Sequence, residues 1–202
     1  TDALMREVDW SRSPLGPRED WPAWLGSTVA LMRDSGFPMF LAAGPELGFL
    51  YNDAYADILG AKHPAAMGAR FQDVWSEIWT DIAPYVDQAL SGQRTWVENL
   101  SLTMNRHGYE EETWFTFSYS PLRDEDGAIA GMFCACTETT GRVLAERALR
   151  ASEERTSGVL EGMAEGFVLL DREFRIVRIN AEGLRLEGCL LYTSPSPRDV
   201  EE

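Results

Sequence analysis

The chain has 202 residues, of which 45% are hydrophobic and 25% are charged, and its formal net charge is −15. An acidic chain repels phosphate backbones and anionic membrane surfaces, so we expect no nucleic-acid partner and no membrane partner. No apolar run approaches the roughly 18 residues of a membrane-spanning helix. The three cysteines are too few and odd in number for a disulfide framework, and no signal peptide pattern begins the chain, so we expect a cytoplasmic protein.

Residues 1–29 are predicted to form an N-terminal arm and a lead helix. Three prolines within residues 14–22 prevent a regular helix in the arm. Trp10 and Trp21 lie in the same stretch, which predicts that the arm packs on another part of the protein. A short helix is expected over residues 23–33.

Residues 30–141 are predicted to form one mixed domain. Apolar runs broken by Gly and Pro predict two strands and then a short helix capped by Asn52. A longer helix follows, with apolar residues at three- and four-residue steps, and Pro84 is expected to kink or split it. Three strands in a meander complete the domain, so the order of elements predicts an α+β fold with an antiparallel sheet. The expected elements are strands over 38–42 and 47–51, helices over 54–59 and 71–90, and strands over 95–104, 113–121 and 128–138.

Residues 142–160 are predicted to form a linker helix. The sequence over residues 143–161 is rich in Ala, Glu, Arg and Leu, which all favour helix. Its apolar stripe is thin, and such a polar helix is more stable paired with a partner than alone. We therefore expect a homodimer through this helix. The stripe consists of Ala145, Leu149, Ser152, Thr156 and Val159.

The segment 166–188 repeats the pattern of the segment 36–60. Both begin with Gly-Phe, run apolar, break, resume, and reach an Asn eight positions before a Gly. A repeat about 130 residues apart predicts tandem copies of one domain. The second copy, residues 161–188, has room for its first two strands and first helix only, too little chain to bury a core.

The order of elements resembles a PAS domain over residues 30–141. Three stretches resemble one bacterial PAS subgroup more closely: Leu-Tyr-Asn-Asp-Ala-Tyr at 50–55, Trp-x-Glu-Ile-Trp at 75–79 and Phe-Ser-Tyr-Ser-Pro at 117–121. The resemblance implies a PAS fold with a five-stranded antiparallel sheet and helices on one face. Members of this subgroup commonly lie at the N-terminus of sensor histidine kinases, often hybrid ones with a receiver domain.

The resemblance therefore implies a sensory module that passes the state of a ligand or partner to downstream kinase domains in a two-component phosphorelay. The expected signal exit is Glu138, Thr139 and Thr140, because the last strand meets the linker helix without a flexible Gly/Ser segment. Two alternatives remain: a ligand-free module for dimerisation or protein interaction, with a filled core, and the input domain of a cyclic-dinucleotide enzyme. The sequence contains no phosphate-binding Gly loop and no nucleophile elbow, so we expect no catalytic residue in it.

An apolar pocket is expected between the long helix and the sheet, where PAS domains hold their ligands. Trp75 and Trp79 stand one helical turn apart and are expected to point the same way. Core packing against the sheet is the favoured role of the two tryptophans, and capping of the short helix is the favoured role of Asn52; lining the pocket is the functional alternative for all three. Such a pocket suits a small apolar ligand. The candidate pocket residues are Asn52, Trp75, Trp79, Phe117, Tyr119 and Cys134.

The sequence argues against several cofactors, but it does not identify the ligand. A light-oxygen-voltage (LOV) flavin adduct needs a reactive Cys on the helix after the second strand, and none stands between Asn52 and Arg70. We do not expect haem, because residues 71–90 contain no His. His63 and His107 have no Cys nearby, so we expect no metal site.

Residues 189–202 interrupt the second copy. Their stretch Cys-Leu-Leu-Tyr-Thr-Ser-Pro-Ser-Pro-Arg-Asp resembles the translation of a transposase-type sequencing adapter, and a Ser/Pro loop is the alternative. We expect a non-native tail after Gly188. The chain begins with Thr1 and not with Met, which agrees with a fragment.

Overall fold

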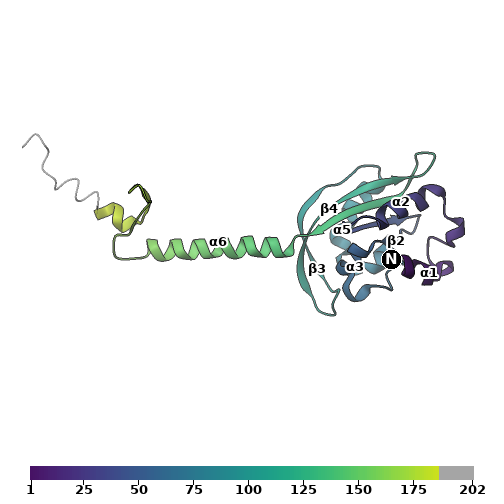
Figure 1. Ribbon diagram of the computed structural model, residues 1–202, viewed down its shortest axis with the longest axis horizontal. Helices are drawn as coiled ribbons and strands as arrows, with labels where there is room; N and C mark the ends of the chain where they lie inside the picture. The colour runs from purple at the N-terminus through teal and green to yellow at the C-terminus, as the bar shows by residue number, and fades with distance from the viewer. Residues whose placement is uncertain (187–202) are drawn as a thin grey trace, which may run out of the picture. The chain divides into compact units, whose positions relative to one another are not determined.

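The computed structural model describes residues 1–186, which fall into two compact units. The first unit is Thr1–Val143, and the second begins at Leu144. Figure 1 shows the helices and strands of both units, coloured from the N-terminus to the C-terminus. The predicted non-native tail, residues 189–202, lies outside the described residues.

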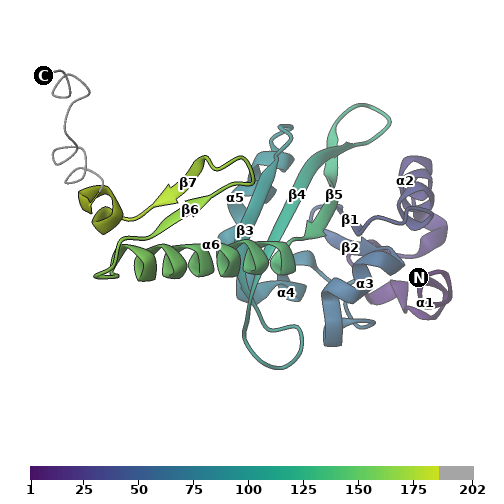
Figure 2. The same cartoon turned by 60° about the vertical axis from the view of Figure 1, so that its left-hand side comes forward.

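The first unit is built on a five-stranded antiparallel sheet with the strand order β2-β1-β5-β4-β3. The last strand lies at the centre, where Cys134 of β5 stands opposite Phe40 of β1 and Tyr119 of β4. The predicted α+β architecture is therefore confirmed, because the meander returns to pair with the first hairpin (Figure 2). The strands are β1 (Met39–Ala43), β2 (Gly48–Tyr51), β3 (Val97–Met104), β4 (Glu111–Arg123) and β5 (Ile129–Glu138).

Two helices, α1 and α2, precede the sheet in the chain, and α3, α4 and α5 lie between the second and third strands. The lead helix α2 has the predicted bounds. The arm before it begins with the short helix α1, and its proline-rich part, residues 10–22, holds only short 3-10 turns, since proline lacks the N–H that a helix interior needs. The helices of this unit are α1 (Asp2–Glu7), α2 (Ala23–Arg33), α3 (Asp53–Leu59), α4 (Phe71–Val74) and α5 (Trp79–Leu90), with 3-10 turns η1 (Trp10–Arg12), η2 (Arg18–Asp20), η3 (Gly60–Lys62) and η4 (Ser76–Ile78).

The prediction of one long helix over residues 71–90 is wrong. The helix is interrupted at Trp75, whose backbone angles of φ −116° and ψ 35° are not helical. Pro84, the expected break, lies inside α5 without ending it. At the true break, the Val74 carbonyl accepts a hydrogen bond from Lys62 Nζ at 2.5 Å. A side chain far along the chain therefore compensates for the irregular backbone, which no local pattern reveals.

The N-terminal arm packs on the rest of the first unit, as its tryptophans predict. Ser13 Oγ donates to the Gly68 carbonyl at 2.7 Å, and Leu15 lies against Gly48. A Cβ atom at Gly48 would come within 2.4 Å of Leu15 Cγ, so this contact requires glycine. The Trp10 and Trp21 rings meet edge to face, with centroids 4.9 Å apart.

The second unit contains little chain and few buried side chains. The helix α6 (Thr140–Glu161) begins in the first unit and continues into the second, with no buried residue along it. The strands β6 (Val168–Leu170) and β7 (Ile176–Ile179) pair antiparallel, and a helical stretch follows over residues 181–186. In the part of the chain that the structure describes, no helix has the length and apolar character to cross a membrane.

Candidate ligand-binding site

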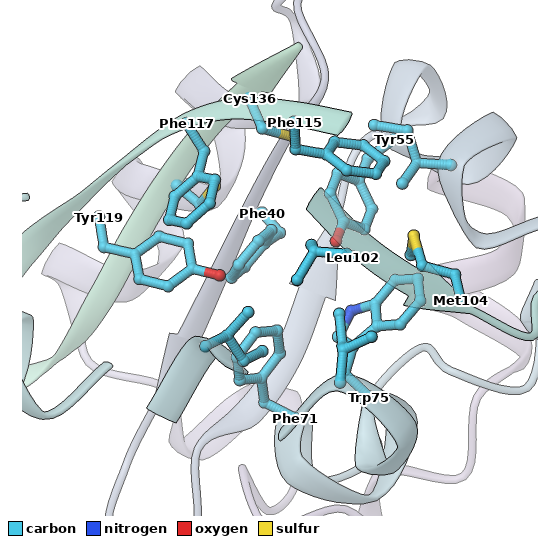
Figure 3. A pocket seen from close by; sticks show the side chains of 14 residues that line it. Phe40, Tyr55, Phe71, Trp75, Leu102, Met104, Phe115, Phe117, Tyr119 and Cys136 are labelled. Carbon is cyan, nitrogen blue, oxygen red and sulfur yellow. The ribbon is translucent and has the colours of Figure 1, made fainter. Parts of the chain in front are cut away.

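A cavity lies between the central strands of the sheet and the helices α3, α4 and α5 (Figure 3). It contains about 30 Å³ of space that the centres of water molecules can occupy. One water needs at least about 10–15 Å³ on this measure, so the cavity has room for about two waters. None of the lining side chains carries a formal charge. They are Phe40, Tyr55, Ile58, Phe71, Trp75, Ile78, Ile82, Leu102, Met104, Phe115, Phe117, Tyr119, Cys134 and Cys136.

The strand β4 supplies aromatic side chains by simple alternation. Phe115, Phe117 and Tyr119 all line the cavity, whereas Thr116 and Ser118 between them point to the other face. The Phe117 and Tyr119 rings lie 4.6 Å apart at an interplanar angle of 34°. The structure thus brings two of the predicted pocket residues into contact with each other.

Of the two tryptophans in the predicted site, only Trp75 lines the cavity. Trp75 is 1% exposed and lines the cavity. Trp79 is only partly buried; it packs its ring on Phe71 at a centroid distance of 6.0 Å and is not among the lining residues. They separate because the helix is interrupted between them, which removes the one-turn relationship that the sequence predicts.

Asn52 is fully buried but does not line the cavity. Its Oδ1 accepts from the backbone N–H groups of Met39 and Tyr55, both at 3.1 Å. Its Nδ2 donates to the carbonyls of Met32 at 3.1 Å and Phe37 at 2.7 Å. Asn52 therefore caps α3 and also ties α2 and β1 to it, which corresponds to the structural role weighed for it above.

Three polar atoms interrupt the apolar lining. Figure 3 shows the Tyr119 hydroxyl directed toward Phe40 in the middle of the cavity, and the Tyr55 hydroxyl directed toward the indole nitrogen of Trp75. Burial raises the pKa of both tyrosine hydroxyls well above their usual range. Both therefore remain protonated and act as neutral hydrogen-bond donors.

Cys134 and Cys136 stand two apart on β5, and both line the cavity, as the strand period predicts. Both are free and buried. Burial raises the pKa of the Cys134 thiol well above its usual range. Since the thiolate is the reactive form, Cys134 acts here as a small apolar wall residue.

The predicted signal exit is held by a network centred on Arg106. Its guanidinium donates to both Glu138 carboxylate oxygens at 2.8 and 2.9 Å, and to Glu111 at 2.8 Å. Thr140 Oγ1 donates to Glu138 at 2.9 Å, and Thr139 Oγ1 donates to Asn99 Oδ1 at 2.8 Å. All three predicted exit residues are thus tied to the sheet.

Sequence reasoning missed Arg106, although it is only 6% exposed. It stands in the loop between β3 and β4, where no periodic pattern distinguishes a buried residue from a solvated one. The only available signal was a basic residue among the many acidic ones nearby, and that signal is weak.

The two histidines lie away from the cavity lining. His63 Nδ1 and the Tyr51 hydroxyl are 3.0 Å apart, whereas the His107 side chain is 42% exposed and lies near Glu111. Among residues 1–186, no group of three or more His, Cys, Asp or Glu side chains is arranged to hold a metal ion.

The fold and cavity together define a small α+β domain that encloses an apolar site and delivers its last strand into a helix. The PAS fold family matches residues 39–144, just over half of the chain, and the chain belongs to this family. No curated protein matches the chain.

Similar solved structures are PAS and LOV domains at low identity. The PAS domain from Bordetella pertussis BvgS is 18% identical, with 66% of this chain and 99% of that one covered and a TM-score of 0.44. A sensory box sensor histidine kinase from Vibrio cholerae is 14% identical, with 56% and 90% covered and a TM-score of 0.40. An RNA-binding light-oxygen-voltage receptor is 17% identical with a TM-score of 0.48; 69% of this chain is covered, but the chain spans only 40% of that receptor.

Proposed function

We propose that residues 30–141 are the sensory input module of a bacterial sensor histidine kinase, which passes the state of its cavity through β5 into α6. One observation carries this proposal. Cys134 and Cys136, which line the cavity, and Glu138, which anchors the exit, stand on the same strand, and α6 begins two residues after Glu138. A displacement of the cavity wall therefore has a short and stiff route to the helix.

Arg106 supplies a second route. It follows the cavity residue Met104 by two positions, and its guanidinium donates to the carbonyl of Ile58 at 3.2 Å. Ile58 lines the cavity from α3, while the same guanidinium holds Glu138 at the exit. A ligand that displaces α3 or the end of β3 therefore alters the geometry of the Arg106–Glu138 pair.

The cavity favours a small, neutral, mainly apolar ligand that carries a hydrogen-bond acceptor. Its lining offers the Tyr119 and Tyr55 hydroxyls and the Trp75 indole as donors, and no cation to receive a carboxylate. A buried unpaired charge is too costly for such a site. With room for about two waters as it stands, the cavity must expand to admit even a single aromatic ring, and a flavin or haem does not fit without large rearrangement.

Sequence motifs support the coupling to a kinase, and α6 supports dimerisation. The resemblance of the motifs around Asn52, Trp75 and Phe117 to sensor-kinase PAS domains favours downstream kinase domains. α6 leaves Leu144, Leu149 and Val159 exposed and has no buried residue, which favours pairing with the same helix of a second copy. A cyclic-dinucleotide enzyme is the alternative output.

The small size of the cavity favours a second candidate, a ligand-free interaction module. The two candidates are separated by titration with acetophenone, which has a carbonyl acceptor, ethylbenzene, which has none, and benzoate, which is charged. We expect acetophenone to raise the melting temperature and to change hydrogen exchange over residues 138–144. The Tyr119→Phe variant should bind it about fivefold more weakly, since one hydrogen bond contributes about 1 kcal/mol.

The matched control is Tyr109→Phe, which removes the same hydroxyl from an exposed position. Equal binding of benzoate would contradict the ligand class. If none of the three compounds binds, the ligand-free module becomes the better assignment.

A further inference from the structure

Four of the five side-chain hydrogen bonds of Asn52 in the first unit recur around Asn180 in the second, and the fifth, to the Ser35 carbonyl, does not. Asn180 Oδ1 accepts from the N–H groups of Phe167 at 2.7 Å and Gly183 at 2.8 Å. Its Nδ2 donates to the carbonyls of Leu160 at 2.9 Å and Glu165 at 3.0 Å.

Each of these partners stands 128 positions after its counterpart around Asn52. The pairs are Met39 with Phe167, Tyr55 with Gly183, Met32 with Leu160, and Phe37 with Glu165. The strand registers agree at two pairs, because Phe40 opposite Tyr51 corresponds to Val168 opposite Ile179 and the next pair corresponds as well. They then differ by one residue, since an irregularity after Leu169 places Leu170 opposite Ile176. The sequence pattern aligns Gly36-Phe37 with Gly166-Phe167, which are 130 positions apart. The structure corrects this alignment by two positions, so that Phe37 corresponds to Glu165.

This correspondence gives α6 the role that α2 has in the first unit. The end of α2 is tied to the sheet through the Met32 carbonyl, and the end of α6 is tied to β6 and β7 through the Leu160 carbonyl. The helix that leaves the first domain thus ends as the leading helix of another sheet.

Equivalent side chains differ sharply in exposure between the units. Phe49 is 0% exposed, but Val177 at the same position is 61% exposed. Ala42 is 0% exposed, but Leu170 is 45% exposed. In the first unit the short helix α4 covers part of this apolar face, because its Phe71 ring packs on Phe40 and Phe49. A two-stranded hairpin with an open apolar face is marginally stable at best.

We infer that residues 157–186 are the first part of a second PAS domain, whose apolar face is the interface for the rest of that domain. The rest is supplied by a natural continuation of the chain after Gly188, in place of residues 189–202. The occupant is argued from the first unit, which serves as an internal template. There β5 pairs along β1, Tyr119 of β4 packs on Phe40, and Phe71 of α4 packs on both Phe40 and Phe49. In the described second unit, β6 pairs only with β7, so its other edge offers free backbone groups to a strand equivalent to β5. This inference is independent of any ligand in the first cavity.

The test begins with long-read sequencing of the source DNA across the codon for Gly188. We expect an open frame of about 78 further codons, the span from Ala61 to Glu138 in the first unit, encoding two short helices and a three-stranded meander. The extended chain and the 202-residue chain are then compared by hydrogen exchange. Amides of β6 and β7 should exchange at least about 100-fold more slowly in the extended chain.

Two variants of the extended chain locate the interface. Leu170→Asp, on the inferred face, should abolish the added protection, whereas Arg172→Asp, in the exposed turn, should leave it unchanged. The inference is overturned if the frame encodes no such segment or if the extended chain leaves the hairpin unprotected. It is also overturned if protection in the 202-residue chain rises with protein concentration, since a second copy would then cover the face.

Discussion

The ammonium group of Lys62 lies 4.5 Å from the centroid of the Trp75 ring. The same Nζ donates to the two carboxylate oxygens of Glu77 at 2.6 and 2.7 Å, and to the Val74 carbonyl. All three partners belong to the segment where the helix is interrupted. Lys62 therefore stabilises both the irregular backbone and the aromatic wall of the cavity.

Replacing Lys62 with Met is expected to lower the free energy of unfolding by about 1–2 kcal/mol, because the cation–π contact, the ion pair and a carbonyl partner are lost together. Urea denaturation followed by tryptophan fluorescence measures this change. Arg70→Met is the matched control, since the Arg70–Glu46 pair is about half exposed and should contribute well under about 1 kcal/mol. Equal losses in the two variants would show that Lys62 has no special role.

The two tryptophans near the helix break should differ in their contribution to stability. Trp75→Ala removes a fully buried ring from the cavity wall and should cost about 3–5 kcal/mol. Trp79→Ala removes a partly buried ring and should cost about half as much. Thermal and urea unfolding of both variants checks this order, and a larger loss for Trp79→Ala would mean that Trp79 is the main core residue.

The exit network should make stability depend on pH through Glu138. Burial alone would raise the pKa of this carboxyl, but hydrogen bonds from Arg106 and Thr140 and the charge of Arg106 together lower it. A carboxyl whose pKa is lower in the folded state stabilises the protein fully when the pH is above its unfolded pKa, which is about 4.3 for Glu. This contribution is lost as the pH falls through the folded pKa. Below about pH 4.5, Glu138→Gln should therefore lose stability less steeply than the unmodified chain.

Glu125→Gln, in the exposed turn before β5, is the control for this experiment and should follow the pH dependence of the unmodified chain. The measurement is the free energy of unfolding at several pH values between neutral and acid. Identical slopes for Glu138→Gln and the unmodified chain would contradict the role of the Arg106–Glu138 pair.

Cys134 and Cys136 should resist alkylation in the folded protein. The Cys134 thiol is buried and its pKa is raised, so the reactive thiolate forms only when the sheet opens. Iodoacetamide labelling, read by peptide mass spectrometry, should be at least about 100-fold slower under native conditions than in denaturant. Rapid native labelling of either cysteine would show that the cavity is open to solvent.

Much of this protein follows from local sequence patterns. The bounds of α2, the alternation of Phe115, Phe117 and Tyr119 on β4, and the cap at Asn52 were all predictable, because each depends on periodicity or on a short-range hydrogen bond. The repeat was also visible in the sequence, although its register became clear only from the bonds of Asn180. These features determine the α+β order of the elements.

The candidate site depended on contacts between distant parts of the chain. Trp79 lies outside the cavity because the helix breaks at Trp75, and that break is stabilised by Lys62 from η3. Arg106 holds the exit through Glu138, 32 positions away, across the pairing of β4 with β5. Periodicity and composition report only on near neighbours along the chain. The tertiary structure alone therefore decided which side chains enclose the cavity and which charge secures the exit.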